Sequence, residues 1–320
     1  MYLRQISNNN NNNHNKHNKH DAIHFMCMKQ QQRIAGVGDF MIIGVVGLGL
    51  IGGSMAKAIT HYSEHTVLGM DISEQVVLKA KMLGVISCEL THEGITDCDI
   101  IILALYPHDT ISFISENAER LKGTTVIDCC GVKRLVLDAV LPVSHEYGFI
   151  FIGGHPMAGI EHSGFEYSMV DLFNGASMIL TPDASADIVI LDSLKHFFLS
   201  IGFGNIQISG PDEHDRIIAY TSQLAHVLSS AYVKSEAAMQ HSGFSAGSFQ
   251  DMTRVALLNE DMWTELFLAN SDNLADEVGA LAKRLTQYAD AIREHDEEGL
   301  KALLRDGRER KEYLTERDAK

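Results

Sequence analysis

The chain has 320 residues, of which 45% are hydrophobic and 21% are charged, and its formal net charge is -16 at pH 7. This length suits about two domains with buried cores. So acidic a chain repels phosphate backbones and anionic lipid surfaces, which argues against nucleic-acid and membrane partners. No apolar run approaches the roughly 20 residues that cross a bilayer.

Residues 1–40 differ from the rest of the chain. Six consecutive asparagines, Asn8 to Asn13, precede a tract that mixes histidine, lysine and asparagine. Such a tract has too little apolar surface to offset its ordering entropy, so we expect a disordered tail. We attribute its histidines to biased composition rather than to a metal site. We expect the working polypeptide to start at or near Met41.

The five cysteines are odd in number and lack the spacing of zinc ligands. We expect reduced thiols in a cytoplasmic protein without a bound metal. No secretory signal is recognisable at the start of the sequence.

From Ile42 to about residue 210, strand-like and helix-like segments alternate. The predicted strands are Ile42–Val46, Thr66–Met70, Ile100–Leu105, Thr124–Asp128, Phe149–Gly153, Ser177–Thr181 and Asn205–Ser209. The predicted helices are 51–61, 73–83, 108–120, 133–146 and 185–200. Because helices separate the strands, we expect parallel pairing and right-handed crossovers. This pattern predicts a Rossmann-type, doubly wound α/β domain over residues 41–210. Residues 211–320 show helical periodicity and predict an all-helical second domain.

A glycine-rich turn joins the first predicted strand to the first predicted helix. It reads Gly47-Leu48-Gly49-Leu50-Ile51-Gly52. In this setting the first glycine permits a tight turn, the second lets the backbone approach a pyrophosphate, and the third lets helix and strand pack closely. The start of the helix offers free N–H groups and a positive dipole end to the phosphates.

Asp71 follows the second predicted strand, 19 residues after Gly52. A carboxylate there accepts both ribose hydroxyls of NAD and repels the 2′-phosphate of NADP. We therefore predict NAD as the cofactor. The alternative is that Asp71 caps the next helix, a role that Ser73 could also fill.

His155 follows the predicted strand Phe149–Gly153, within Gly154-His155-Pro156-Met157-Ala158-Gly159. Ligands of doubly wound sheets bind outside the carboxyl ends of the strands. Histidine is the side chain best suited to proton transfer near neutral pH. These properties favour His155 as the catalytic base over a purely structural histidine.

Four motifs together resemble the prephenate dehydrogenase family. They are Gly-Leu-Gly-Leu-Ile-Gly-Gly-Ser at 47–54, His-Pro-Met-Ala-Gly at 155–159 with Glu161 and Gly164, His214-Asp215-Arg216, and Asp-Met-Thr-Arg-Val-Ala at 251–256. The resemblance runs from about Ile42 to near Asn270. It implies NAD-dependent oxidative decarboxylation of prephenate to 4-hydroxyphenylpyruvate in tyrosine biosynthesis. It also implies that residues 211–320 bind substrate and form a homodimer.

The resemblance also implies roles for single residues. His155 matches the family's catalytic histidine, and Arg254 matches an arginine that binds a substrate carboxylate through its planar fork. The alternative for Arg254 is a surface or helix-end ion pair. His226 matches the last histidine of a Ser-His-Leu-Pro-His segment near the substrate side chain. We expect His214 to have an ordering role near the domain junction, on the substrate side.

Two departures from the family pattern stand out. The segment that ends at His226 begins Ser222-Gln223, so one histidine is missing, and Ala225 replaces the proline. Gly131 stands where many members carry a serine that supports the catalytic histidine, which leaves the partner of His155 unassigned. Lys133 keeps its place, where it could contact a ligand or cap a helix.

Three other functions remain open from the sequence. Arogenate dehydrogenase is the first, because Glu161 could meet an ammonium group, although it could equally be a carboxylate at a helix start. A β-hydroxyacid or imine-type dehydrogenase is less favoured, because those enzymes lack the His-Pro-Met-Ala-Gly motif. A non-catalytic NAD-binding sensor would suit Gly131 and Gln223, whereas His155 and Arg254 argue against it.

Overall fold

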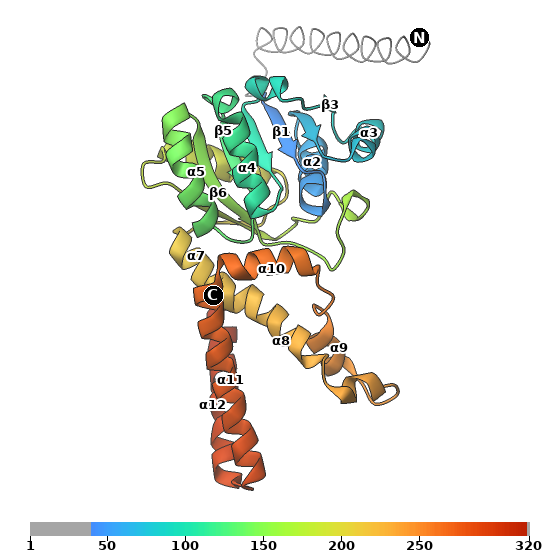
Figure 1. Ribbon diagram of the computed structural model, residues 1–320, viewed down its shortest axis with the longest axis vertical. Helices are drawn as coiled ribbons and strands as arrows, with labels where there is room; N and C mark the ends of the chain where they lie inside the picture. Colours follow the sequence, from blue (N-terminus) through green and yellow to red (C-terminus); the bar gives the residue numbers. More distant parts are fainter. Residues whose placement is uncertain (1–39, 319–320) are drawn as a thin grey trace, which may run out of the picture. The chain divides into compact units, whose positions relative to one another are not determined.

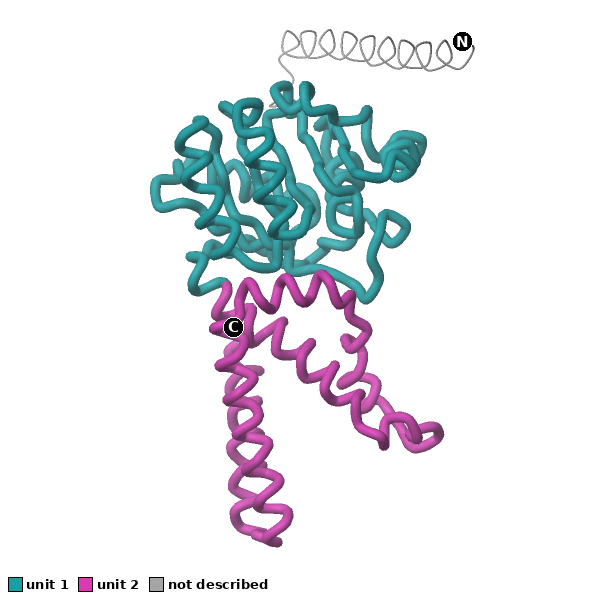
Figure 2. Tube along the Cα trace, viewed as in Figure 1, with its two compact units in different colours: residues 1–214 teal, residues 215–320 magenta. Residues whose placement is uncertain are grey.

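The structure is a computed structural model that describes residues 40–318. The chain forms two compact units, which divide between His214 and Asp215 (Figure 2). The first unit is built on a β-sheet, and the regular elements described in the second are all helices (Figure 1). The division falls inside the helix Pro211–Ile218, close to the boundary predicted near residue 210, and it places His214 in the first unit.

The first unit contains an eight-stranded sheet in the order β3-β2-β1-β4-β5-β6-β7-β8. The strands are β1 Ile42–Val46, β2 Thr66–Met70, β3 Cys88–Glu89, β4 Ile100–Leu103, β5 Thr125–Asp128, β6 Ile150–Pro156, β7 Ser177–Pro182 and β8 Asn205–Ile208. Every residue of β1 and β4 is buried. Such continuous apolar strands fit a sheet that is covered on both faces, and they confirm the predicted doubly wound fold.

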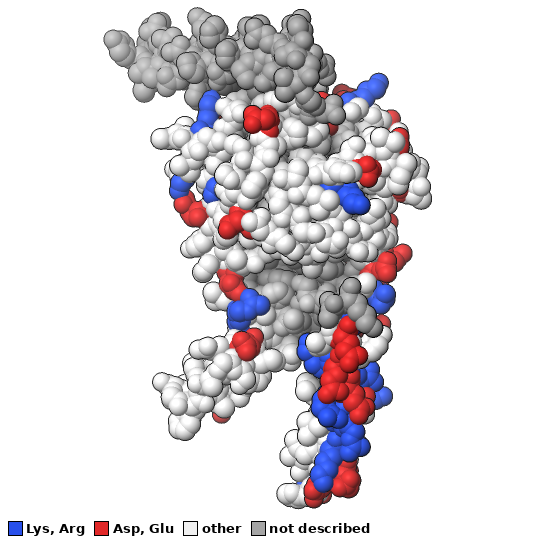
Figure 3. Space-filling view, turned by 180° about the vertical axis from the view of Figure 1, so that it is seen from behind, with Lys and Arg blue, Asp and Glu red and all other residues white. Residues whose placement is uncertain are grey.

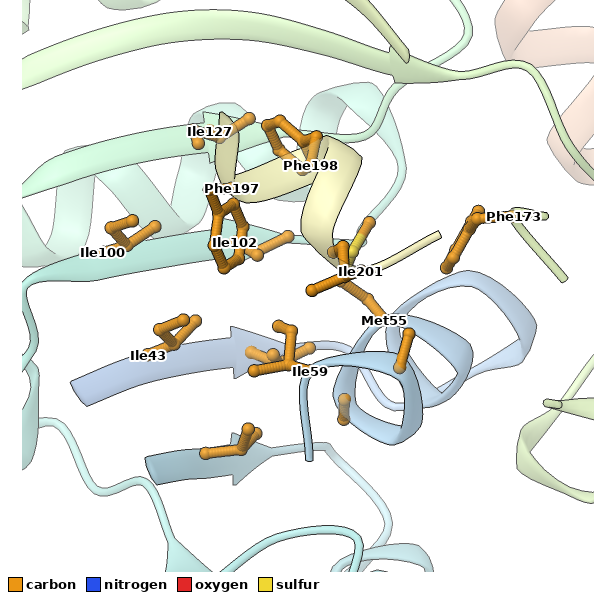
Figure 4. Close-up of a cluster of buried hydrophobic side chains, with 14 of the residues drawn as sticks. Ile43, Met55, Ile59, Ile100, Ile102, Ile127, Phe173, Phe197, Phe198 and Ile201 are labelled. Atoms are coloured by element: carbon orange, nitrogen blue, oxygen red, sulfur yellow. The ribbon is translucent and has the colours of Figure 1, made fainter. Parts of the chain in front are cut away.

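Helices cover both faces of this sheet. One buried cluster joins the sheet to α2 (Leu50–Tyr62), α3 (Glu74–Met82) and α6 (Ile188–Ser200). The other joins it to α4 (Pro107–Asn117) and α5 (Arg134–Tyr147). Figure 4 shows how the first cluster is built: isoleucines of β1, β4 and β5 face Met55 and Ile59 of α2 and the aromatic end of α6. This packing fixes the strand ends, where the candidate site lies.

The predicted parallel pairing is wrong at one position. β6 and β7 are antiparallel, with Pro156 opposite Met178 and Ile152 opposite Pro182, although β7 and β8 are again parallel to each other. The connection 157–176 contains only a 3₁₀ turn, Phe165–Tyr167. A parallel neighbour requires a crossover back to the start of the sheet, usually by a helix, whereas an antiparallel neighbour can begin where the preceding strand ends.

The predicted end of one strand is also wrong. β6 continues through His155 to Pro156, so His155 lies within a strand opposite Ile179 and not in a loop. Its parallel pairing with β5 ends earlier, at Ile127 and Ile152. His155 therefore projects beyond the end of β5 while β7 still holds its backbone.

The second unit takes in the end of α7 (Pro211–Ile218) and then a π-helical turn, η4 (Ala219–Gln223). The later elements are α8 Leu224–Tyr232, η5 Glu236–Gln240, α9 Gly247–Thr253, α10 Glu260–Ala269, α11 Ser271–Arg293 and α12 Glu297–Asp318. Figure 3 shows that charged side chains gather on α11 and α12. Several form exposed pairs one helical turn apart, such as Arg310 with Asp306. Exposed pairs of this kind contribute little stability.

The first unit also contains 3₁₀ helices at Glu93–Asp97 and Ala118–Leu121. No helix within residues 40–318 is long and apolar enough to cross a membrane.

Candidate active site

The three glycines of the turn between β1 and α2 are required for different reasons. Gly47 has a φ of 84°, and a Cβ atom there would lie 2.5 Å from the carbonyl oxygen of Ala104. A Cβ atom at Gly52 would lie 1.8 Å from the carbonyl oxygen of Gly47. At Gly49 a Cβ atom would meet nothing within 4 Å. The fold therefore explains Gly47 and Gly52, whereas Gly49 leaves open space at the start of α2.

Asp71 joins the end of β2 to this turn. Its Oδ2 accepts a hydrogen bond from the backbone N–H of Leu48 at 2.7 Å, and its Oδ1 accepts from the N–H of Ser73 at 2.9 Å. Ser73 takes the N-cap position of α3, so Asp71 is not the cap residue. A carboxylate has about four lone-pair sites, so Asp71 keeps acceptor capacity for a ligand. The next side chain, Ile72, is fully exposed and brings no positive charge.

These features fit a dinucleotide. Gly49 stands at the N-cap position of α2, and within the described chain no side chain caps this helix start. The helix start therefore presents free N–H groups and a positive dipole end beside open space, as a pyrophosphate requires. The side chain of Leu48 is buried, and Gly52 has none. A ligand would therefore contact the backbone of the turn, together with the partly exposed side chains of Leu50 and Ile51.

A second histidine engages His155. Its Nδ1 atom lies 2.9 Å from the Nε2 atom of His214, and the two ring centroids are 5.1 Å apart. His214 is only 2% exposed and belongs to the first turn of α7, whereas His155 is partly exposed. The contact uses one ring nitrogen of His155, which leaves Nε2 to face a ligand.

The surroundings of His155 favour its neutral form. Burial lowers its pKa well below the ordinary value of 6.5, and the neighbouring His214 and Lys133 lower the pKa further. A neutral imidazole accepts a proton, so His155 is suited to act as a base at pH 7.

Lys133 lies near His155 and forms a buried ion pair with Asp128. Both the Lys133 ammonium and its partner, the Asp128 carboxylate, are completely buried. Lys133 also donates to the carbonyl oxygen of Gly154 at 2.6 Å. It occupies the N-cap position of α5 without a side-chain capping bond, so its side chain supports β6 and does not cap the helix.

The second unit contains a pocket of about 310 Å³. Both His226 and Arg254 line it, as does Asp251. The Nδ1 atom of His226 lies 3.2 Å from the carbonyl oxygen of Val255. Because a carbonyl only accepts, Nδ1 carries the hydrogen and Nε2 is left as an acceptor. Burial lowers the pKa of His226; the Val255 carbonyl opposes this shift and Arg254 adds to it.

Gln223 replaces a family histidine without leaving a buried polar group unsatisfied. It is buried, its amide donates to the carbonyl oxygen of Leu266 at 3.0 Å, and its Oε1 accepts from Asn270 at 2.8 Å. Asn270 also donates to the carbonyl oxygen of Asp215 at 2.8 Å. Gln223 thus ties the π-helical turn to α10 and to Asn270, the residue before α11, and it does not line the pocket.

The structure brings the predicted site residues together in three groups. Asp71 meets the glycine turn, His155 meets His214, and His226 shares a pocket with Arg254. Glu161 lies in the exposed part of the connection between β6 and β7, outside the regular helices and strands. It is therefore not the carboxylate at a helix start that was one of its two expected roles.

Several residues at these sites were not predicted from the sequence. Ser222 and Ser229 line the pocket with His226, and the Ser229 hydroxyl is buried without a hydrogen-bond partner among the described residues. Their spacing of four and three residues, on one helical face, was the available signal. The ring of Trp263, 3.8 Å from that of His226 between centroids, has no such signal.

Comparisons with known proteins agree with this arrangement. Residues 55–206 match the family described as prephenate dehydrogenase, nucleotide-binding domain, and residues 210–306 match prephenate dehydrogenase, dimerization domain. The prephenate dehydrogenase of Bacillus subtilis (strain 168) is 29% identical over 269 residues, which are 80% of this chain and 71% of that protein.

Two solved structures are similar over most of their length. Prephenate dehydrogenase from Aquifex aeolicus, in complex with hydroxyphenyl propionate and NAD+, is 28% identical with a TM-score of 0.73, covering 86% of this chain and 99% of that one. The Synechocystis arogenate dehydrogenase is 25% identical with a TM-score of 0.72, covering 85% and 100%.

Proposed function

Because the chain belongs to the prephenate dehydrogenase family of NAD-dependent oxidoreductases, we propose that it oxidatively decarboxylates prephenate to 4-hydroxyphenylpyruvate. The observation that carries this proposal is the contact between His155 Nδ1 and His214 Nε2 at the carboxyl end of β6. A base so placed can accept a hydrogen bond, and then the proton, from the ring hydroxyl of prephenate at Nε2.

The reaction balances with a single base. The carbinol carbon loses hydride, its hydroxyl proton passes to His155 Nε2, and the bond to the ring carboxylate breaks. The electron pair of that bond enters the ring, which becomes an aromatic phenolate as carbon dioxide leaves, and the phenolate oxygen then takes the proton back from His155 Nε2. When bound, NAD supplies the hydride acceptor. The protein itself orients the hydroxyl, keeps the imidazole neutral and receives the proton.

We assign substrate binding in the second unit to Arg254 and His226. The guanidinium of Arg254 suits a carboxylate of prephenate, because its planar fork pairs with both oxygens. His226 offers Nε2 toward the substrate side chain, since its Nδ1 faces the Val255 carbonyl. His214 acts on the substrate indirectly, through His155.

A steady-state assay of prephenate against arogenate, each with NAD and with NADP, tests the proposal. We expect turnover of prephenate with NAD, measured as NADH formation and as loss of carbon dioxide from the ring. Arogenate is the second candidate, because the Synechocystis arogenate dehydrogenase is similar over 85% of this chain. A higher kcat/KM for arogenate than for prephenate would make arogenate the substrate in place of prephenate. Tight NADH binding without turnover of either substrate would contradict the enzyme assignment.

We also propose that the protein is a homodimer. Residues 210–306 match a dimerization domain. The second unit exposes large apolar side chains, among them Leu257 at 78% and Leu268 at 69%, while its buried cluster is small. Apolar surface of this extent is typical of an interface. Light scattering of the purified protein should give twice the chain mass. The cytoplasmic location stays a prediction from the sequence.

A further inference from the structure

Asp128 and Lys133 hold both backbone groups of Gly154, the residue before His155. The N–H of Gly154 donates to Asp128 Oδ1 at 3.0 Å, and its carbonyl accepts from Lys133 Nζ at 2.6 Å. Asp128 and Lys133 also form an ion pair with each other. The backbone pairing of β5 with β6 ends at Ile152, so these two side chains continue the support of β6 from the β5 side where the strand ladder stops.

The two glycines of β6 make room for this ion pair. A Cβ atom at Gly154 would lie 2.3 Å from the carbonyl oxygen of Asp128, and one at Gly153 would lie 3.0 Å from the Lys133 side chain. Asp128 also accepts from the N–H of Cys130 at 3.0 Å, which fixes its carboxylate. Every member of the group is therefore constrained, as a positioned site requires.

Burying the charges of Asp128 and Lys133 costs desolvation free energy. Desolvating two ions is often not fully repaid by their attraction, and replacing a buried pair by apolar groups is frequently neutral for stability. A hydrophobic pair would fill this space, but it would supply neither the two hydrogen bonds to Gly154 nor a positive charge near the imidazole. A role beyond stability therefore fits the observation better.

We propose that the buried Asp128–Lys133 pair is a positioning device for His155, which fixes the end of the strand that carries the imidazole and holds a positive charge near it. Its catalytic consequence rests on the proposed function. Lys133 acts as a positioning residue through its contacts with the Asp128 carboxylate and the carbonyl oxygen of Gly154.

Few other titratable or charged groups of the first unit lie near His155. The titratable or charged neighbours of His155 are His214 on α7 and Lys133 at the start of α5, with Asp128 behind Lys133. Burial raises the pKa of Cys129 to about 12 and raises that of Cys130 well above its ordinary value, so both thiols stay neutral. On β7 the residue opposite His155 is Ile179.

The test compares the wild-type protein with the double variant Asp128→Asn, Lys133→Met. This variant removes both charges together, keeps an acceptor at position 128 and leaves no ion unpaired. Lys133→Met alone is the second variant. Lys57→Met is the matched control, because Lys57 also donates to a backbone carbonyl in the same unit, that of Ser168 at 2.6 Å, without touching β6.

Two readouts separate positioning from simple stability. The first is the titration of His155 by NMR of ¹³C-labelled histidine, assigned with His155→Asn. The second is kcat and KM for prephenate. In both Lys133 variants we expect the His155 midpoint to rise, and to rise more in Lys133→Met alone, because that variant leaves the Asp128 carboxylate without its cation. We expect kcat to fall about 10- to 100-fold in both, with KM within about twofold. The Lys57 variant should match the wild type in both.

A folded double variant with wild-type kcat and an unchanged His155 midpoint would overturn the proposal. If the wild-type protein turns over neither prephenate nor arogenate, the proposed function fails. The titration would still decide whether Lys133 acts on His155, because it needs no substrate.

Discussion

The Nδ1 atom of His155 lies 2.9 Å from the Nε2 atom of His214, with the two rings inclined at 60°. For Nε2 of His155 to accept a proton, Nδ1 must carry the hydrogen and donate it to His214. His214 must then hold its own hydrogen on Nδ1. With His155 as the base, His214 would orient the imidazole and select its tautomer.

Replacing His155 tests the base directly. We expect His155→Asn to lower kcat by about 10² to 10⁴, the usual contribution of a positioned base. The asparagine amide retains a donor toward His214, so the Tm and the Kd for NAD should match the wild type. Turnover near the wild-type rate would remove His155 from the mechanism.

The role of His214 predicts different effects for two substitutions. His214→Leu removes the acceptor for Nδ1 of His155, and we expect kcat to fall by at least about tenfold. His214→Gln presents an amide oxygen in its place and should restore part of the loss. Equal losses in both variants would argue against tautomer selection.

The pH dependence of kcat/KM provides a further check on His155. Its pKa is lowered by burial, by His214 and by Lys133, so the active neutral form persists below pH 6.5. The acid limb of the wild-type profile should therefore lie below 6.5, with activity lost as pH falls through the lowered pKa. In His214→Leu the limb should move toward higher pH. A wild-type limb above 6.5 would contradict this assignment.

Substitutions at two glycines of the turn should separate an effect on stability from an effect on NAD binding. Gly52→Ala places a Cβ atom 1.8 Å from a backbone oxygen, so the apo-protein should lose at least about 1–3 kcal/mol of stability. Gly49→Ala meets nothing within 4 Å and should leave the apo Tm unchanged, yet raise the Kd for NAD about tenfold or more. Unchanged NAD binding in Gly49→Ala would place the pyrophosphate elsewhere.

Asp71 should set the preference for NAD over NADP. Asp71→Asn removes the charge that repels a 2′-phosphate and weakens a hydrogen bond to the ribose. We expect the ratio of kcat/KM for NAD to that for NADP to fall about tenfold. Glu74→Gln makes the same chemical change at an exposed position nearby and serves as the control. An unaltered ratio in Asp71→Asn would exclude the ribose contact.

Arg254 should act on substrate affinity. We expect Arg254→Gln to raise KM for prephenate about 10- to 100-fold with a smaller effect on kcat, through loss of charge-assisted hydrogen bonds. Arg305→Gln, on the exposed surface of α12, is the control. A normal KM in Arg254→Gln would favour the alternative of a helix-end ion pair, since Arg254 directly follows α9.

Much of the fold could be predicted because its signals are local. The strands Ile42–Val46 and Thr66–Met70 were predicted with their observed bounds, since buried parallel strands are short apolar runs between turns. The glycine turn and Asp71 follow a fixed spacing. The antiparallel pairing of β7 could not be predicted in this way, because no pattern in residues 157–176 shows which way the chain returns.

The residues that position His155 could not be predicted from the sequence for a different reason. His155 and His214 are 59 residues apart, and Asp128 and Gly154 are 26 apart, so no local spacing links them. A buried lysine is also the less expected outcome, because charged side chains are almost never fully buried without a partner. The sequence identified Lys133 as a residue of interest, and only the fold shows what it contacts.

The hairpin of β6 and β7 has a consequence for how this enzyme can change. The chain leaves the sheet after Pro156 and re-enters it at Ser177, beside Met178, which pairs with Pro156. Residues 157–176 therefore begin and end at one place. Lengthening such a loop costs little closure entropy and leaves the strand register intact. Segment 157–176 can therefore change in length or sequence while His155 stays in position.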